Sequence, residues 1–551
     1  MAELALLWHM HQPDYRDPAS GDFTRPWVLL HALKDYAEMA QHLERHPGVR
    51  CSVNFVPVLL EQIEDYGDQF AREAWRDPLL RALALDKPDA LPEADRSWLL
   101  EVALDCHAPT MIEPFAGFRK LRDLLSVART GSGNGLPYLS GRYFSDLATW
   151  CVLAWCGESL RREGGVVTTL MAKGSQFELA DRRALLVEIA RVLHELLPRW
   201  RALAERGQVE LCCSPSHHPI APLLLDFSSA REAHPDCALP AEPCYHGGRT
   251  RLDAQLAEAR ASHERRFGRP PLGLWPAEGA LSQACLAQIA AAGFRWAASG
   301  QGVLAHSAGP EASTDRPWQA GAGPGSELTL FFRDDRLSDL IGFEYSKWHG
   351  RDAARHFMAE LQARQRAEPQ ALVTVFLDGE NAWAHYPYNG WYFIDDLYQA
   401  LEEAREIGTT TLADACATQA RRRKRLSELV AGSWVQGTLS TWIGSPAKNR
   451  AWELLSELKQ SVDRVLASSR LDDAQRGAIL HRLAVCEGSD WFWWLGDDNP
   501  PTTVAYFDRL FRANLEQLYR LLELPVPASL AHPVGRRGGG PDSGGPMRRA
   551  N

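Results

Sequence analysis

The chain has 551 residues, of which 45% are hydrophobic and 24% are charged, and its formal net charge is −10. This length and composition predict a large catalytic domain with at least one further globular domain. The negative charge argues against a nucleic-acid-binding protein, because such proteins carry basic surfaces that neutralise phosphates.

The sequence also gives expectations about compartment and partners. No segment approaches the roughly 18 apolar residues of a membrane span, and residues 1–8 lack the basic start of a secretory signal. The 11 cysteines contain no C-x-x-C pair, which indicates reduced thiols instead of a disulfide framework or a zinc ribbon. We therefore expect a cytoplasmic protein with no membrane partner.

Predicted strands and helices alternate along most of the chain. Apolar runs predict strands at residues 4–8, 50–56, 209–212, 272–275, 294–298, 328–332 and 372–377. Helical spacing predicts helices at 28–46, 249–267, 281–292 and 391–406, and a mainly helical insertion over 57–206, interrupted by a glycine-rich loop at 131–135. This order favours a distorted parallel α/β barrel with helical insertions, and an open doubly wound sheet is the alternative.

The last part of the chain has a different character. No strand is predicted after about residue 415, whereas helices are predicted at 447–468, 472–486 and 504–523. Residues 532–551 are rich in Gly, Pro and Arg without periodicity, which predicts disorder. We expect a catalytic barrel domain at 1–415, a helical domain at 416–531 that completes the active-site cleft, and a tail at 532–551.

Two histidine-containing clusters follow predicted strands, where parallel α/β folds collect functional groups. His9 and His11 are two residues apart, so on a continued strand they project from one face. That arrangement suits sugar hydroxyls, metal ligation or a purely structural pair. The segment from Glu210 to His218 is the second cluster, and a solvated histidine pair is its other interpretation.

Two carboxylate clusters follow later strands. Glu278 lies between an apolar strand and a helix, where an acid can also complement a helix N-terminus. Asp378 ends an apolar strand, and spacing alone separates it neither from Glu380 nor from Asp334 and Asp335. Cleaving a glycosidic bond requires one carboxyl group to protonate the leaving oxygen and a second to trap the sugar.

These segments together resemble glycoside hydrolase family 57. The motifs that carry the resemblance are, in order, residues 9–13 (HMHQP), 207–219, 275–279 (WPAEG), 378–381 (DGEN), 432–444 and 489–494 (SDWFWW). The resemblance spans roughly residues 4–520 and is greatest for the family's amylopullulanase and α-amylase branch. It implies a (β/α)7 barrel followed by helices, a retaining double-displacement mechanism, and no cofactor or metal.

Residue roles follow from the same resemblance. It implies Glu278 as the nucleophile and Asp378 as the general acid and base. It also implies a substrate-binding set made of His9, His11, His218, Trp275, Glu380, Trp383, Trp434 and Trp442.

We therefore expect a retaining hydrolase of α-1,4 bonds, with α-1,6 bonds as a further linkage, in glycogen, starch-type glucans or maltodextrins. A branching enzyme or 4-α-glucanotransferase would use the same two carboxylates, with the loop at 131–135 as a candidate lid. A metal-dependent deacetylase or mannosidase-like enzyme built on His9, His11 and Asp378 is a further alternative, as is a glucan-binding protein without activity.

Overall fold

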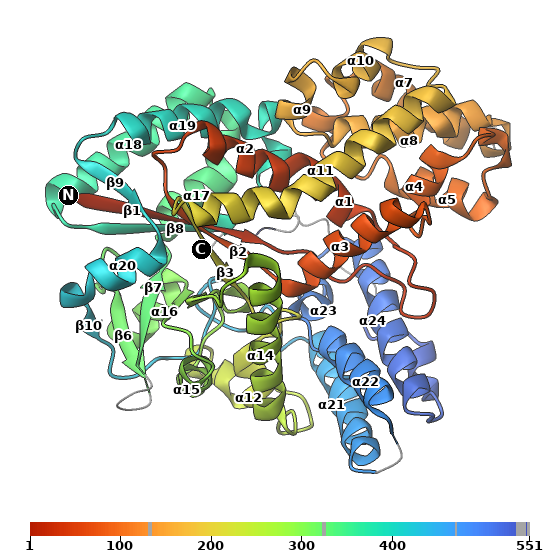
Figure 1. Ribbon diagram of the computed structural model, residues 1–551. Helices are drawn as coiled ribbons and strands as arrows, with labels where there is room; N and C mark the ends of the chain where they lie inside the picture. The colour runs from red at the N-terminus through yellow and green to blue at the C-terminus, as the bar shows by residue number, and fades with distance from the viewer. Residues whose placement is uncertain (131–134, 322–326, 469–470, 536–546, 548–551) are drawn as a thin grey trace.

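The computed structural model describes residues 1–130, 135–321, 327–468, 471–535 and 547 (Figure 1). At its centre lies a curled sheet of mostly parallel strands. The seven parallel strands are β1 (Ala2–Met10), β2 (Cys51–Phe55), β3 (Val209–Cys213), β4 (Gly273–Leu274), β5 (Trp296–Ser299), β7 (Glu327–Phe332) and β8 (Leu372–Asp378), with spatial order β7-β5-β4-β3-β2-β1-β8.

The two ends of this order approach each other. The Asp334 backbone N–H, just after β7, donates to the Thr374 carbonyl of β8 at 2.7 Å, and the Thr374 hydroxyl donates to the Phe332 carbonyl at 2.5 Å. In an open doubly wound sheet these strands would be opposite edges. The sheet therefore has the curvature of the predicted distorted parallel barrel.

Three short strands lie outside this set: β6 (Trp318–Gly321), β9 (Ile407–Thr410) and β10 (Lys424–Arg425). β9 pairs with β1, β6 pairs antiparallel with β7, and β10 pairs with β6. The prediction that no strand follows residue 415 is thus wrong for β10. Its two residues are charged and exposed, so they carry no apolar pattern that a sequence reading can detect.

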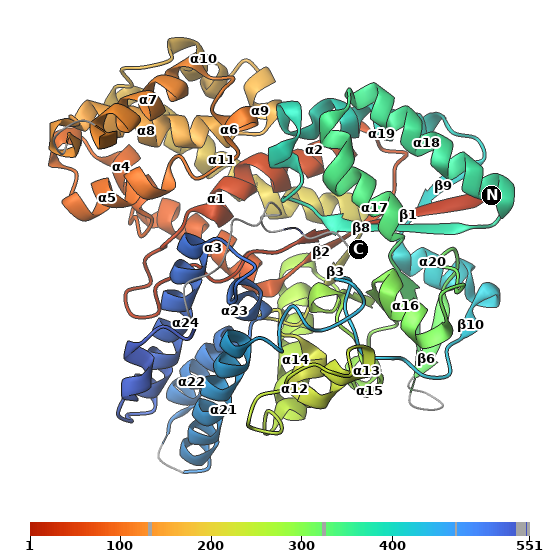
Figure 2. The same cartoon turned by 180° about the vertical axis from the view of Figure 1, so that it is seen from behind.

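A helical insertion separates β2 from β3. Between β1 and β2, the predicted single helix consists of α1 (Trp27–His31), a π-helical turn η1 (Ala32–Tyr36) and α2 (Ala37–Arg45). The insertion comprises α3 (Pro57–Arg72), α4 (Pro78–Ala84), α5 (Glu93–Val102), α6 (Ala108–Met111), α7 (Ala116–Thr130), α8 (Gly141–Ala154), α9 (Glu158–Arg162), α10 (Val166–Lys173) and α11 (Leu179–Glu205). Helices α7–α10 gather at one end of the molecule (Figures 1 and 2). Residues 131–134 of the candidate lid lie outside the described residues.

Further helices pack around the sheet and beyond it. Those of the barrel are α12 (Ala221–Leu225), α13 (Ala230–Ala233), α14 (Gly248–Phe267), α15 (Gln283–Ala291), α16 (Gln301–Ala308), α17 (Asp335–Asp339), α18 (Gly350–Ala367), α19 (Trp391–Glu403) and α20 (Leu412–Thr418). Those of the C-terminal region are α21 (Pro446–Leu466), α22 (Asp473–Cys486), α23 (Ser489–Trp494) and α24 (Pro501–Leu521).

The C-terminal helices α21, α22 and α24 form a group at the side of the molecule away from α7–α10 (Figure 2). Among the described helices, none is long and apolar enough to cross a membrane. Most of the predicted tail, residues 536–546 and 548–551, lies outside the described residues.

Candidate active site

Strand register brings the first polar residues together. His9 on β1 lies beside Asn54 of β2 and beside Asp378 of β8. The His9 Nδ1 lies 2.6 Å from Asn54 Oδ1, which fixes the imidazole ring. Because all three strands are parallel, their carboxyl ends meet at the same edge of the sheet. His9 and Asp378, far apart in sequence, therefore occupy one site.

The Glu278 side chain is presented by a strained turn. Glu278 has φ 57° and ψ 23°, a left-handed conformation that costs a non-glycine residue about 1 kcal/mol or more. Gly279 follows at φ 60°, and a Cβ there would lie 3.3 Å from the Ser299 backbone. The conformation is held because Ser299 Oγ donates to the Gly279 carbonyl at 2.5 Å.

Trp434 holds Glu278 at two points. Its backbone N–H donates to the Glu278 carbonyl at 3.0 Å, and its indole N–H donates to Glu278 Oε2 at 2.9 Å. An antiparallel bridge between Leu281 and Gly432 secures the two segments beside these bonds. The segment after residue 431 thus positions the carboxylate directly.

Glu278 and Asp378 line one cavity of about 480 Å³. Around it lie further polar residues and a group of aromatic residues. The polar residues include His9, His11, Gln12, Arg333, Glu380 and Asn381, and the aromatic residues include Trp27, Trp155, Phe343, Trp434, Trp493, Trp494 and Phe507. Indole and phenyl faces can stack on the apolar faces of sugar rings. The cavity is therefore suited to a carbohydrate. Met547, which falls within the predicted tail, is buried and also lines it.

Burial changes the acidity of Asp378 and Glu380, two of the carboxyl groups that line the cavity. Desolvation raises the pKa of Asp378 to about 6, although an N–H from Asn381 at 2.9 Å and the charge of Arg333 favour its ionised form. Desolvation and the neighbouring Asp378 charge raise the pKa of Glu380 well above its usual range. Glu380 Oε1 accepts the His11 backbone N–H at 3.1 Å. Such raised values are typical of groups that deliver protons.

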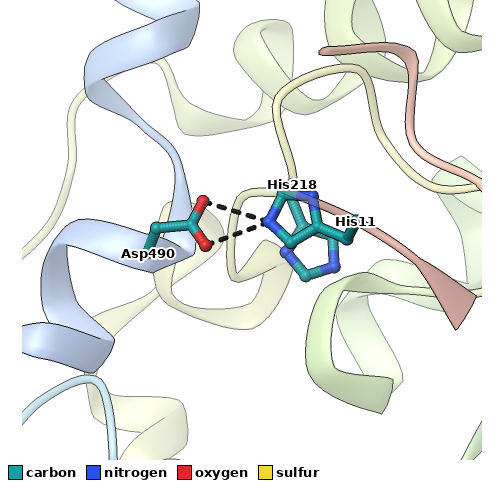
Figure 3. Close-up of side chains that lie close together, drawn as sticks. All are labelled: His11, His218 and Asp490. Carbon is teal, nitrogen blue, oxygen red and sulfur yellow. Dashed lines mark hydrogen bonds and ion pairs between the residues drawn. The ribbon is translucent and has the colours of Figure 1, made fainter. Parts of the chain in front are cut away.

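Two histidine rings from distant parts of the chain stack on each other, and the carboxylate of Asp490 lies beside them (Figure 3). The rings of His11 and His218 lie 3.9 Å apart between centroids, and His11 Nε2 donates to Asp490 Oδ1 at 3.0 Å. His218 Nδ1 lies 2.9 Å from Ser489 Oγ and 4.0 Å from Glu278 Oε1. Desolvation lowers the pKa of His218 well below its usual value, so this ring is neutral at neutral pH.

The predicted substrate-binding tryptophans differ in their placement. Trp434 lines the cavity, whereas Trp275, Trp383 and Trp442 are at most 1% exposed and are not among its lining residues. Trp275 packs edge-on against Trp434 with ring centroids 5.0 Å apart, and Trp442 packs against Trp493 at 5.8 Å. In this structure Trp275 and Trp442 therefore support cavity residues from behind, whereas the Trp383 indole N–H donates to the Gly379 carbonyl at 2.9 Å.

The competing acidic residues have structural partners. Asp334 Oδ1 accepts the Leu337 N–H at the start of α17, and Asp335 pairs with Arg333 at 2.9 Å. Glu210 accepts bonds from the Ser52 hydroxyl and the Trp296 indole beneath the site. None of these three acids is among the residues that line the cavity.

Sequence reasoning missed Asp490, Asn54 and Arg333 as site residues. Asp490 belongs to the 489–494 motif but contacts His11 across 479 positions, and no spacing rule spans that distance. Asn54 is, with Ser52, a polar residue within a fully buried strand, which is a usable signal. Arg333 is buried and donates to the Phe376 carbonyl at 3.0 Å, and its positive charge favours the ionised form of Asp378.

The metal alternative was predicted on His9, His11 and Asp378. The potential ligand atoms at this site that lie within 4.8 Å of one another belong instead to His11, His218 and Asp490. His11 and Asp490 already bond to each other, and His218 bonds to Ser489. These bonds hold the three side chains in position.

Comparisons with known proteins decide the family. The model of glycosyl hydrolase family 57 matches residues 5–427. The chain belongs to this family. No curated protein matches the family 57 chain in sequence.

Several solved structures share the fold of this family 57 chain at low sequence identity. A family 57 branching enzyme from Thermococcus kodakaraensis is 16% identical with a TM-score of 0.57, covering 94% of this chain and 90% of that one. A branching enzyme of the same type from Pyrococcus horikoshii is 16% identical with a TM-score of 0.55, covering 96% of each chain. An α-amylase from Thermotoga maritima is 12% identical with a TM-score of 0.57, covering 95% and 93%.

Proposed function

We propose that this chain is a retaining α-glucan hydrolase that cleaves α-1,4 bonds, with α-1,6 bonds as a second linkage, in glycogen, starch-type glucans or maltodextrins. The observation that carries the proposal is the pairing of Glu278 with Asp378 on one aromatic-lined cavity, with the pKa of Asp378 raised to about 6. Membership of family 57 supports it, and two of the structural neighbours are named branching enzymes and one an α-amylase.

In the first step, a Glu278 carboxylate oxygen attacks the anomeric carbon while protonated Asp378 gives its proton to the leaving glycosidic oxygen. The glycosidic C–O bond breaks and a glycosyl ester forms on Glu278. The Trp434 indole N–H at Glu278 Oε2 orients the carboxylate for this attack.

In the second step, ionised Asp378 takes a proton from a water molecule, whose oxygen attacks the anomeric carbon. The ester bond breaks, Glu278 is released as a carboxylate, and the sugar leaves with its original anomeric configuration. Asp378 ends the cycle protonated, as it began. A pKa near 6 suits a group that must donate and accept a proton in alternate steps.

The remaining polar residues are suited to hold the sugar beside Glu278. His9 and His11 line the cavity, and imidazole nitrogens can form hydrogen bonds with hydroxyl groups. Burial lowers the pKa of His9 to about 3, so it is neutral at neutral pH. His218 and Asp490 fix the His11 ring through stacking and a hydrogen bond.

Transfer to a second sugar is the alternative outcome of the second step, and one observation favours it. Trp27 and Trp155 line the cavity with stacked rings 5.5 Å apart; Trp27 lies on α1 and Trp155 directly follows α8. Such a platform could bind an acceptor glucan, whose hydroxyl would replace water.

A product assay with matched variants tests the proposal. Wild type and Glu278→Gln are compared on maltoheptaose, amylose and glycogen, with exposed Glu264→Gln on α14 as the control. We expect new reducing ends from wild type and the control, and a loss of at least about 10³-fold, roughly 4 kcal/mol of barrier, in Glu278→Gln. Longer or branched products with few new reducing ends would assign a transferase instead.

Azide rescue separates the two carboxylates. Glycine suits the left-handed backbone at position 278, so Glu278→Gly should fold, and azide should then yield a glycosyl azide of inverted configuration. Azide with Asp378→Ala should yield the retained configuration, because Glu278 still forms the ester. Full activity of Glu278→Gln would overturn both assignments.

A further inference from the structure

A second group of metal-ligating side chains lies outside the cavity. Glu61 on α3, His217 in the segment after β3 and His481 on α22 each place one potential ligand atom within 4.8 Å of the others. The rings of His217 and His481 lie 5.1 Å apart at an interplanar angle of 80°. None of the three is among the residues that line the active-site cavity. The group joins α3 of the helical insertion and the segment after β3 to the C-terminal helix α22.

His217 supplies the independent sign that a ligand belongs here. Its side chain is 5% exposed, and its Nε2 is buried without a hydrogen-bond partner in the described structure. Its Nδ1 lies 3.1 Å from Ser216 Oγ, and its backbone N–H donates to Gln255 Oε1 at 2.9 Å. A buried polar nitrogen without a partner costs about 1–3 kcal/mol, so an additional partner would relieve this cost.

The protonation states suit a cation. Burial lowers the pKa of His217 well below its usual value, which leaves the neutral imidazole that metals bind. Burial raises the pKa of Glu61 to about 7, so a cation would favour its ionised form at neutral pH. The charged groups that act on the three ligands are of both signs: Asp14, Arg16, Arg251, Glu258, Arg266 and Arg482.

The nearest of these charges is already paired. Arg16 lies 3.9 Å from Glu61 Oε2 but donates to both oxygens of Asp14 at 2.8 Å. A cation at Glu61 would therefore replace a long contact and leave the closer Asp14 pair intact.

The ligand types and their mobility point to zinc. Two histidine nitrogens and one carboxylate oxygen form a common zinc set, with bonds of about 2.0–2.2 Å and ligand atoms roughly 3.4 Å apart in tetrahedral geometry. Because the ligand atoms already lie within 4.8 Å of one another, the side chains need to draw together by no more than roughly 1.4 Å. His481 is exposed and Glu61 is partly exposed, so both have room to rotate toward the fixed His217 ring.

We infer that Glu61, His217 and His481 form a Zn²⁺ site that fastens α22 to the barrel. The inferred site is separate from the glucan cavity, so its test needs no substrate. Bound zinc would stabilise the folded chain by an amount that grows with the logarithm of its free concentration. Because α23 follows α22 and carries Asp490, zinc bound at this site would also stabilise the position of the helix that contacts His11.

Calorimetric titration of the full chain tests this site. The protein is stripped with a chelator, separated from it, and titrated with zinc sulfate at pH 7.5, and thermal unfolding is recorded with and without zinc. We expect one binding event assigned to this site and a rise in Tm of a few degrees at about 100 times the Kd. His481→Ala and Glu61→Gln should each weaken this event by about 100-fold or more and abolish the Tm rise.

Two control variants separate this site from surface histidines and from the group of His11, His218 and Asp490. His194→Ala removes another exposed helical histidine and should bind zinc as wild type does. Asp490→Asn removes the carboxylate of the His11, His218 and Asp490 group and should leave the event intact. The inference is overturned if wild type shows no zinc binding tighter than millimolar. It is equally overturned if His481→Ala binds as wild type does, or if Asp490→Asn alone abolishes binding.

Discussion

The protonation of Asp378 should set the upper pH limit of activity. The first step needs this carboxyl group protonated, and burial raises its pKa to about 6 from the usual 3.8. Above pH 6, kcat/KM should therefore fall about tenfold per pH unit, because that fraction of the free enzyme loses its acid. If the pKa of Asp378 had its usual value of 3.8, the same fall in kcat/KM would begin about two pH units lower.

The structure gives the size of the effect and a variant that moves it. The difference between 3.8 and about 6 corresponds to about 3 kcal/mol between the two protonation states. Asn381 Nδ2 donates to Asp378 Oδ2 at 2.9 Å and so favours the ionised form. Asn381→Ala should remove this bond and move the alkaline limb upward by about one pH unit.

The assay is the initial rate on maltoheptaose below KM between pH 4 and 9, for wild type and Asn381→Ala. Profiles are normalised to their maxima, so a change in substrate binding alone does not alter the comparison. A wild-type alkaline limb near pH 4, or a limb that moves downward in Asn381→Ala, would refute the reasoning from burial.

Two further predictions concern the same pair of carboxylates. Trp434→Phe keeps an aromatic ring but loses the N–H at Glu278 Oε2, so kcat on maltoheptaose should fall by about 10- to 100-fold. Trp494→Phe, which changes another cavity indole, serves as the control, and equal losses in both would contradict a specific role for the bond. The raised pKa of Asp378 means that the folded chain binds more protons than the unfolded chain between about pH 4 and 6, so stability falls as pH rises through that window. Asp378→Asn should therefore be more stable than wild type by about 1–3 kcal/mol at pH 7 and equally stable at pH 4. Denaturant unfolding of both proteins at the two pH values measures the difference in free energy of unfolding. Equal stability of the two proteins at both pH values would contradict the raised pKa of Asp378.

The sequence predicts the barrel well because its strands are buried on both faces. The apolar runs that end at His9 and Asp378 are continuous, so each strand and its polar end can be identified before any pairing is known. The short strands β6, β9 and β10 were missed because each contains half-buried or exposed positions, so that no continuous apolar run marks it. The equally short strands β4 and β5 are fully buried and lie within apolar runs, which is why they could be predicted.

The site itself could be predicted only in part. The segments around Glu278 and Asp378 are recognisable as ordered motifs, but a motif does not say which way a side chain points. Trp442 belongs to such a motif and is fully buried, whereas Trp434, eight positions earlier, bonds to Glu278. Asp490 reaches His11 only through the packing of the C-terminal helices, which sequence periodicity does not specify.

At position 278, the residue that best stabilises the left-handed backbone is not the residue that catalysis requires. Glycine is the residue that tolerates this conformation at least cost, yet it has no carboxylate. A library selected only for survival at high temperature would therefore enrich inactive chains carrying glycine at position 278. Directed evolution of this protein toward heat tolerance must therefore measure turnover in every round. The variant with the least strained backbone at position 278 has no carboxylate there and cannot form the glycosyl ester.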